Sequence, residues 1–302
     1  MKQIPFYIVD VFTDQAFSGN QLAVFILDDN LEVSIRQQLA KELHFSETIF
    51  LQLTENHIID AWIHTPEEEI PFGGHPLIGA AFIWHSRYGS TSNKMVVRTK
   101  SGLVPVLIDN QTSIYWMTQQ TPQFSQVIPP CEAAKVLGLK EVDFHPFWPV
   151  QEISTGLPVV VAPVKSVEVL KRTKLNHSAY EALISRIEAK GICVFAMEGD
   201  RSDLSVRDFA PYYGIPEDVA TGSSNGAILA FIMKHEAVSR LSLVSEQGVF
   251  MNRPSTLHLK GEKKVNSFDI HVGGQAVLLA SYVECIEKEP THDQTNLPFN
   301  SV

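Results

Sequence analysis

Two stretches of the chain place an acidic residue before a turn of small residues and an apolar helix. Residues 69–81 read EIPFGGHPLIGAA, and residues 217–227 read EDVATGSSNGA. Small residues at a helix start leave the first backbone N–H groups unpaired, and these groups attract an anion together with the helix dipole. Each turn is therefore predicted to bind a small carboxylate through its backbone. The positions expected to make these contacts are Gly73, Gly74, Thr221 and Gly222.

The two turns are separated by about half of the chain. His75 and Ser223 occupy matching places in them, and the sequence has 302 residues. This spacing predicts an internal duplication whose two helix starts converge on one cleft, where a carboxylate is held between them. The alternative is that both turns are ordinary helix caps.

Glu47 and His75 are candidates for acid–base chemistry. Moving a proton between two carbon atoms requires a group that exchanges protons near neutral pH. Glu47 lies in HFSETIFLQL, where a predicted helix meets a strand, and burial there would raise its pKa. The alternative is an exposed or capping Glu on an edge strand. His75 at a helix start is expected to be neutral, because the dipole disfavours a positive charge; a helix-capping role explains it as well.

Three further polar residues near the turns have both a functional and a structural explanation. Asp218 and Ser223 are candidates for holding or protonating a substrate, but a favourable charge at a helix start and an N-cap account for them equally. Asn20 in the segment SGN is predicted to be a polar cleft residue, and an Asx turn explains it nearly as well.

Two common motifs match the sequence only in part. GHPLIGAA has Ala80 and Ala81 where a P-loop requires Lys and a hydroxyl residue, so a P-loop is rejected. GSSNG fits the G-x-S-x-G pattern of hydrolases, with Ser224 as the nucleophile and Asp269 and His271 as triad partners. The segment before it is predicted to be a loop, whereas this motif needs a buried strand. A serine hydrolase is therefore the weaker alternative.

The histidines and acids around the first turn lack the spacing of a metal site. His64, His75 and residues 67–69 do not form an HExxH or similar pattern on one face of an element. The acids are predicted to form a solvated turn, and we expect no metal.

Composition and charge limit the class of protein. The length allows two domains, and a net charge of −10 disfavours nucleic acid or an anionic membrane as a partner. No apolar stretch reaches about 18 residues, and the N-terminus does not resemble a signal peptide. The three cysteines share no CxxC spacing, which favours a reducing compartment. We therefore expect a soluble cytoplasmic protein.

Hydrophobic periodicity predicts the elements that position these residues. Amphipathic helices are expected at 34–45 and 178–191, with capping boxes at Ser34–Gln37 and Ser178–Glu181 and a stop at Gly191. Apolar helices are expected at about 75–88 and after Gly222. The remaining regular segments are expected to be strands, at 6–12, 22–27, 47–53, 57–64, 94–109 (a hairpin), 113–119, 157–164, 191–198, 203–211, 240–250, 255–261, 268–274 and 276–286.

Five segments together resemble the phenazine-biosynthesis PhzF-like family, which has the diaminopimelate-epimerase fold. These are VDVFTDQAFSGNQLAVF, FSETIFL, EIPFGGHPLIGAA, VRDFAPYYGIPEDVATGSSNGA and VGGQAVLL, in this order over nearly the whole chain. The resemblance implies an α+β fold of two similar domains, each a curved, mostly antiparallel sheet forming a half-open barrel around a central helix. The expected lobes are 1–122 and 123–286, with a last strand that can return to the first lobe, and 287–302 as a mobile tail.

The resemblance also implies roles for four residues. Glu47 in S-E-T is the expected acid–base group, His75 belongs to G-H-P, and Asp218 and Ser223 belong to E-D-x-A-T-G-S. The chain departs from the family pattern at three places that affect the expected cleft wall, and so the substrate: Leu77, Val219 and Asn225. The family needs no cofactor or metal and is often dimeric, so a homodimer is expected.

These observations predict a cofactor-independent isomerase. It is expected to move a proton on a small cyclic or unsaturated carboxylic or amino acid, while the family's best-known reaction isomerises trans-2,3-dihydro-3-hydroxyanthranilate. The first alternative is a racemase or epimerase, but the epimerase branch of the fold uses a cysteine pair, and Cys131, Cys193 and Cys285 lie outside both turns. The second is a non-catalytic binding protein on the same scaffold.

Overall fold

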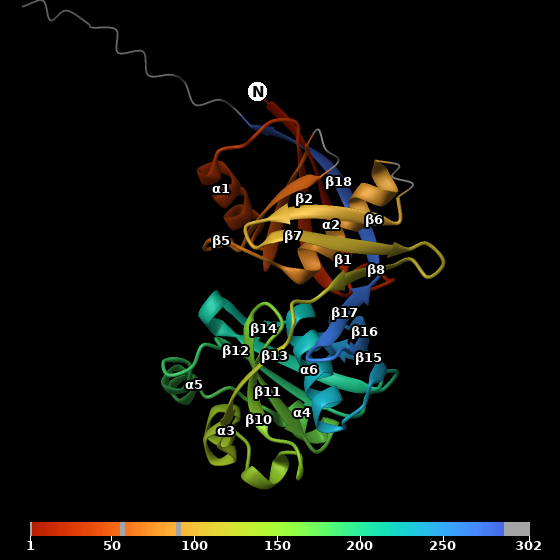
Figure 1. Cartoon of the computed structure of the whole chain (residues 1–302). Coiled ribbons are helices and arrows are strands. Elements are labelled where there is room, and N and C mark those ends of the chain that lie inside the picture. Colours follow the sequence, from red (N-terminus) through yellow and green to blue (C-terminus); the bar gives the residue numbers. More distant parts are fainter. Residues whose placement is uncertain (1, 55–57, 89–91, 287–302) are drawn as a thin grey trace, which may run out of the picture.

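The computed structural model describes residues 2–54, 58–88 and 92–286. Figure 1 shows two lobes, with the red to yellow first part of the chain in one and the green to blue later part mainly in the other. Residues 287–302, for which a mobile tail was predicted, lie outside the described residues. No helix among the described residues is long and apolar enough to cross a membrane.

The first lobe is a curved sheet around one central helix. Strands β2 and β3 run parallel and flank the crossover helix α1, and β4 and β6 run parallel and flank α2. The other neighbouring strands pair in antiparallel fashion. The elements are β1 (Lys2–Val11), β2 (Asn20–Leu27), α1 (Val33–Leu43), β3 (Glu47–Leu53), β4 (Ile59–His64), β5 (Glu69–Ile70), α2 (Gly74–Arg87), β6 (Lys94–Thr99), β7 (Gly102–Asp109) and β8 (Ile114–Thr118).

The second lobe repeats this order. Strands β11 and β12 run parallel, and so do β13 and β15, which flank the helix α6. The elements are β9 (Gln123–Ile128), α3 (Pro130–Leu137), η1 (Glu141–Asp143), β10 (Val150–Ser154), β11 (Pro158–Val164), α4 (Val167–Arg172), α5 (His177–Ile184), β12 (Gly191–Ala196), β13 (Leu204–Ala210), η2 (Pro211–Tyr213), β14 (Ile215–Asp218), α6 (Gly222–His235), β15 (Arg240–Gln247), η3 (Val249–Met251), β16 (Ser255–Lys263) and β17 (Phe268–Gly274).

The two lobes share strand pairings. The last described strand, β18 (Ala276–Ile286), pairs with β1 along its whole length, and β17 pairs with β8. Figure 1 shows β18 in blue, crossing from the second lobe to lie beside the red β1 of the first. The chain therefore crosses between the lobes twice, once after β8 and once after β17.

The helices α2 and α6 are buried because a sheet curves around each of them. Both are apolar over most of their surface, as expected for a helix that is enclosed on all sides. Leu77, Ile78, Ile228 and Phe231 in these helices are fully buried in one hydrophobic core that extends through both lobes. The predicted α+β class with two similar lobes is confirmed.

The predicted caps of the two amphipathic helices are wrong. Helix α1 begins at Val33 with Glu32 as the N-cap, so Ser34 lies inside the first turn. Helix α5 is capped by Asn176, whose side-chain oxygen accepts a hydrogen bond from the backbone N–H of Ala179 at 3.1 Å. An N-cap is set by where the chain enters the helix, and a Ser–x–x–Gln or Ser–x–x–Glu pattern that begins two residues later does not move it.

Helix α5 also ends earlier than predicted. It stops at Ile184, and the ammonium of Lys190 donates to the carbonyl oxygens of Ile184 and Ile187 at 2.5 and 3.0 Å. Gly191 begins strand β12 and does not serve as a helix stop, because β12 pairs with β11 from this residue onward. The segment before α6, predicted to be a loop, contains the short strand β14, which pairs with β13.

Candidate active site

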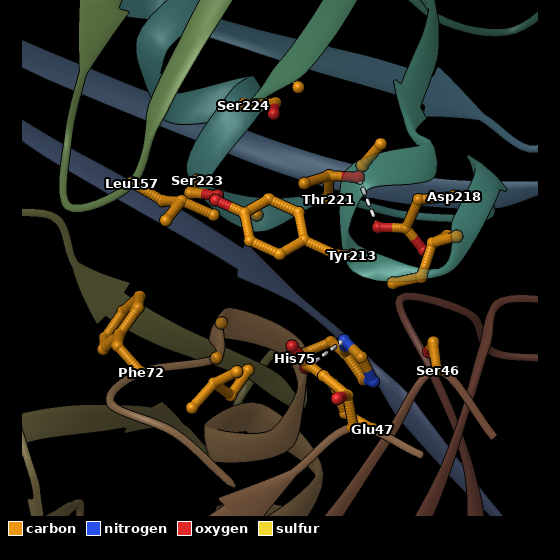
Figure 2. A pocket seen from close by; sticks show the side chains of 18 of the residues that line it. Ser46, Glu47, Phe72, His75, Leu157, Tyr213, Asp218, Thr221, Ser223 and Ser224 are labelled. Atoms are coloured by element: carbon orange, nitrogen blue, oxygen red, sulfur yellow. Dashed lines mark hydrogen bonds and ion pairs between the residues drawn. The ribbon is translucent and has the colours of Figure 1, made fainter. Parts of the chain in front are cut away.

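A cavity of 340 Å³ lies between the two lobes. Figure 2 shows Glu47, His75 and Phe72 on one side of it, and Thr221, Asp218 and Ser223 on the other. Its wall combines acidic groups, glycines and apolar side chains. The lining residues include Ser46, Glu47, Glu68, Glu69, Phe72, Gly73, Gly74, His75, Leu157, Gly191, Asp208, Tyr213, Asp218, Thr221, Gly222, Ser223 and Ser224.

The starts of α2 and α6 meet at this cavity. A Cβ atom added to Gly74 would lie 3.6 Å from the Cα atom of Gly222 and 3.9 Å from the backbone nitrogen of Ser223. Neither N-cap, Gly73 or Thr221, provides a side-chain hydrogen bond to the first turn of its helix. The first N–H groups of both helices are therefore open to an anion in the cavity, and both dipoles favour one there.

Glu47 and His75 lie next to each other on the first-lobe side of the cavity. Oε2 of Glu47 lies 3.1 Å from Nδ1 of His75, and their side chains are 15% and 6% exposed (Figure 2). Glu47 opens strand β3, while His75 is in the first turn of α2. A Cβ atom at Gly73 would lie 2.8 Å from Oε2 of Glu47, so a residue without a side chain is needed for this approach.

Burial makes both members of the pair favour their neutral forms. The pKa of Glu47 is raised well above its usual value, first by burial and then by the negative charge of Asp218. Burial lowers the pKa of His75 to about 3, against a smaller opposing effect of a hydrogen bond with the backbone of Gln21. At neutral pH the imidazole is therefore uncharged, and the Glu47 carboxyl is able to hold a proton and release it to a bound molecule.

Asp218 is fixed from behind by Asn20 and Thr221. The Asn20 side-chain amide donates to Oδ1 of Asp218 at 2.9 Å and to the carbonyl oxygen of Ala220 at 3.0 Å. The Thr221 hydroxyl donates to the other carboxylate oxygen. Burial raises the pKa of Asp218, and the bonds from Thr221 and Asn20 oppose that rise. Asn20 also accepts a hydrogen bond from Ser46 at 3.1 Å.

Gln247 holds the turn that carries Asp218, and no sequence pattern pointed to it. Its side-chain oxygen accepts from the backbone N–H of Thr221 at 3.1 Å, and its amide donates to the carbonyl oxygen of Asp218 at 2.9 Å. Asn225 donates to the same Gln247 oxygen at 2.9 Å. The turn before α6 is thus tied to strand β15. Because the N–H of Thr221 donates to Gln247, it is not free to bind a carboxylate, which corrects the expectation for this residue.

The structure brings nearly all of the predicted site residues together. Eight of them line the cavity: Glu47, Gly73, Gly74, His75, Asp218, Thr221, Gly222 and Ser223. Asn20 is not among the lining residues and lies behind Asp218. Lining residues that the sequence did not predict for the site include Phe72, Leu157, Asp208 and Tyr213. Only Asp208 carried a signal, as a charged residue inside an otherwise apolar strand.

The proposed hydrolase triad does not assemble. Ser224 lines the cavity, whereas Asp269 and His271 are outside its lining and pair with each other at 3.3 Å. Nδ1 of His271 lies 3.1 Å from the hydroxyl of Thr118. The described cysteines are also elsewhere, since Cys131 is exposed, Cys193 is buried and neither lines the cavity.

The chain is similar to proteins of one enzyme family over almost its full length. A family model described as phenazine biosynthesis-like protein (PhzC-PhzF) matches residues 9–281. The trans-2,3-dihydro-3-hydroxyanthranilate isomerase of Pseudomonas aeruginosa is 27% identical over 281 residues, which cover 90% of this chain and 96% of that protein.

Solved structures show the same relationship. The crystal structure of the Bacillus anthracis phenazine biosynthesis protein of the PhzF family matches with a TM-score of 0.87 and 26% identity, over 95% of this chain and 100% of that one. A hydroxyproline epimerase from Agrobacterium vitis matches with a TM-score of 0.66 and 10% identity, over 93% and 92% of the two chains. At that identity the likeness shows a shared fold alone.

Proposed function

Because the chain belongs to the phenazine biosynthesis-like (PhzC-PhzF) family, we propose that it is a cofactor-independent isomerase that works by general acid–base catalysis. Its substrate is a small cyclic or unsaturated carboxylic or amino acid. The observation that carries the proposal is the buried carboxyl of Glu47, with a raised pKa, 3.1 Å from a neutral His75 and beside two open helix starts.

The helix starts supply the first step, which is binding of the substrate's acid group. The free N–H groups near Gly74 and Ser223 hold the carboxylate, and they also stabilise negative charge that spreads onto it when a neighbouring C–H bond breaks. Because the N–H groups are fixed in the folded chain before the substrate arrives, they need little reorganisation during the reaction.

Glu47 carries the proton in the second step. Its ionised carboxylate takes the proton from a carbon, and the electron pair of that C–H bond moves into the adjacent unsaturated system. The carboxyl then returns the proton to a different carbon, so that atoms and charge balance without another reactant. Burial suits this cycle, because a raised pKa makes the carboxylate a stronger base and lets the carboxyl exchange its proton with solvent near neutral pH between turnovers.

His75, Asp218 and Ser223 orient the substrate and exchange protons with its polar groups. The neutral imidazole of His75 is able to donate one hydrogen bond and accept another. Asp218 comes from the opposite lobe and is immobilised by Asn20 and Thr221. Glu47 and His75 lie on one side of the cavity and Asp218 and Ser223 on the other (Figure 2), so the reacting carbon binds between them in this mechanism.

The test is proton exchange with solvent. The protein is incubated in deuterium oxide with trans-2,3-dihydro-3-hydroxyanthranilate and with a panel of small cyclic unsaturated carboxylates, and deuterium uptake at carbon is followed by mass spectrometry. Uptake with one of these compounds, lost in Glu47→Gln and kept in Glu68→Gln, supports the proposal. Glu68 is an exposed residue at the cavity. Glu68→Gln therefore makes the same chemical change as Glu47→Gln but leaves Glu47 and His75 intact.

Other outcomes favour the alternatives. Uptake that survives in Glu47→Gln contradicts the assigned base. Tight binding of a compound without any uptake supports a binding protein on the same scaffold. A covalent adduct at Ser224 with an organophosphate probe supports a serine hydrolase.

A further inference from the structure

An ion pair between the two lobes takes no part in the proposed reaction. Asp10 is the penultimate residue of β1 in the first lobe, and Arg253 lies between η3 and β16 in the second. The Nη2 atom of Arg253 lies 2.7 Å from Oδ1 of Asp10, whose side chain is fully buried. Neither residue is among the described residues that line the cavity. Desolvation offsets much of the attraction in a buried pair, so the main effect of this one is to fix the chain around it.

Arg253 holds the loop between β1 and β2 through three acceptors. Besides its bond to Asp10, its Nε donates to the carbonyl oxygen of Gly19 at 3.0 Å and its Nη2 to that of Ser18 at 3.1 Å. The backbone N–H of Gly19 donates in turn to the carbonyl oxygen of Pro254 at 3.0 Å. A planar guanidinium reaches several acceptors in fixed directions, whereas the ammonium of a lysine is a single point charge. The first-lobe loop is therefore fastened to one segment of the second lobe.

The tip of this loop has little other support. Residues 14–17 are exposed, so apolar packing does not hold them. Phe12 and Phe17 have φ angles of 65° and 67°, in the left-handed region that bulky side chains rarely adopt. Such a conformation persists where the contacts around it impose it. For Phe17 that contact is a hydrogen bond of 2.7 Å from its backbone N–H to Oδ2 of Asp10, so the shape of the loop depends on the ion pair.

Both ends of the loop contact the second-lobe side of the cavity. Gly19, which Arg253 binds, directly precedes Asn20, and the Asn20 amide donates to Oδ1 of Asp218. At the other end, Cζ of Phe12 would lie 3.6 Å from a Cβ atom added to Gly222, so its ring packs against the start of α6. A shift of the loop therefore reaches the proposed site.

The segment that contains Arg253 also contacts the turn of Asp218. The hydroxyl of Ser255 donates at 3.1 Å to the carbonyl oxygen of Val219, the residue after Asp218. One segment thus binds the first-lobe loop and the second-lobe turn together. The position of Asn20 relative to Asp218 consequently depends on how Arg253 holds the loop.

We propose that Arg253, through its ion pair with Asp10, is a positioning residue that keeps Asn20 hydrogen-bonded to Asp218. This inference rests on the proposed function for the role of Asp218 in the reaction. The arrangement itself is independent of the substrate, so it can be tested without one.

The test measures the pKa of Asp218 directly. The full chain is isotopically labelled at its aspartate side-chain carboxyls and titrated by carbon NMR, and the Asp218 signal is assigned by its absence in Asp218→Asn. Asn20→Ala is expected to raise this pKa, because the hydrogen bond from Asn20 lowers it. Arg253→Lys is expected to raise it as well, because Asn20 is no longer held in place. Glu47 across the cavity and Asp208 in the paired strand are unchanged in these variants.

A double variant distinguishes positioning from general support of the fold. If Arg253 acts through Asn20, Arg253→Lys adds no further rise in the pKa of Asp218 when Asn20 is already replaced by alanine. Arg172→Lys is the matched control. Arg172 also pairs with a largely buried acid of the second lobe, Asp143, and neither lines the cavity, so the pKa is expected to stay as in the wild type.

Asp10→Asn is the second variant, and it decides the matter if Arg253→Lys does not fold. It keeps one side-chain oxygen as an acceptor and removes the charge that pairs with Arg253, so the pKa of Asp218 is again expected to rise. The proposal is overturned if this pKa is unchanged in a folded variant of either position. It is also overturned if the rise in the double variant equals the sum of the two single rises.

Deuterium uptake provides a separate readout. With a compound that shows uptake, Arg253→Lys and Asn20→Ala are each expected to lower kcat by about tenfold, because small displacements at an active site are costly. The double variant is expected to lose no more than either single one, and an additive loss overturns the proposal. Absence of uptake with every compound contradicts the isomerase and leaves the NMR result on Arg253 standing.

Discussion

The negative charge of Asp218 in the second lobe raises the pKa of Glu47 in the first. The two carboxyl groups face the same cavity from opposite sides, as Figure 2 shows. Burial of Glu47 is the larger cause of the raised pKa, and Asp218 adds to it. The pKa of Glu47 in one lobe therefore depends on a residue of the other lobe.

This coupling predicts the effect of Asp218→Asn on the pH profile. Removing the charge lowers the pKa of Glu47, so the carboxylate forms at lower pH and the acid limb of the kcat/KM profile moves toward lower pH. We also expect the activity to fall by about 10- to 100-fold, because Asp218 orients the substrate in the proposed mechanism. The profile is measured by deuterium uptake, with Glu68→Gln as a control that leaves the limb in place. An unmoved limb in Asp218→Asn contradicts the coupling.

The raised pKa of Asp208 predicts that stability falls as the pH rises. Its pKa changes from an ordinary value of 3.8 to about 7 in the folded state, so the native protein binds a proton that the unfolded chain has released. Stability from this group is present below pH 3.8 and is lost toward pH 7, by up to about 1.4 kcal/mol per pH unit. Asp208→Asn is expected to flatten the dependence of Tm on pH between 5 and 8. An equal slope in variant and wild type contradicts the assignment.

Gly73→Ala tests how closely the α2 turn must approach Glu47. The new methyl group would lie 2.8 Å from Oε2 of Glu47, so either the carboxyl or the turn must move. We expect activity to fall by about 10- to 100-fold, because small displacements of a catalytic group are costly. Gly222→Ala, whose methyl group meets no atom closer than 3.6 Å, controls for the general effect of a methyl group on folding, measured by Tm. Wild-type activity in Gly73→Ala contradicts the expectation.

Asn20→Ala tests the support behind Asp218. The variant removes the donor to Asp218 and to the carbonyl oxygen of Ala220, which leaves two buried acceptors unmet. We expect a loss of about 1–3 kcal/mol in the free energy of unfolding, measured by urea denaturation. Because Asn20 also lowers the pKa of Asp218, the pH profile is expected to change, which a loss of packing alone does not cause. Ser46→Ala, which removes a donor to Asn20 itself, is expected to have a smaller effect.

The sequence predicted the parts of the site that depend on local chemistry. The two glycine-rich turns were recognisable because small residues followed by an apolar segment indicate the start of a buried helix. Both turns do begin buried helices, α2 and α6. The strands were recognisable from their apolar runs. The resemblance then predicted which side chains share the cavity, and the structure brings Glu47, His75 and Asp218 to it.

Features that depend on tertiary pairing were missed. In the sequence, Asp208 is a single acid within a predicted strand. Its place opposite Asp218 depends on β14, and this strand of four residues is too short to show a periodic hydrophobic pattern. Gln247 is separated from Asp218 by the whole of α6, so its hydrogen bonds to that turn appear only when β15 packs beside β13. The helix caps failed for a related reason, since the direction of chain entry is set by the packing of neighbouring strands.

The return of β18 to β1 has a consequence for synthesis of the protein. Strand β1 is synthesised before every other described strand, yet one of its two partners is the last described strand, while the other is β2. Until residues 276–286 emerge, one edge of β1 stays unpaired, and a nascent chain is exposed to wrong strand pairing there. The first lobe, although encoded first, is thus completed last, and a premature stop before residue 276 disables the lobe that carries Glu47 and His75.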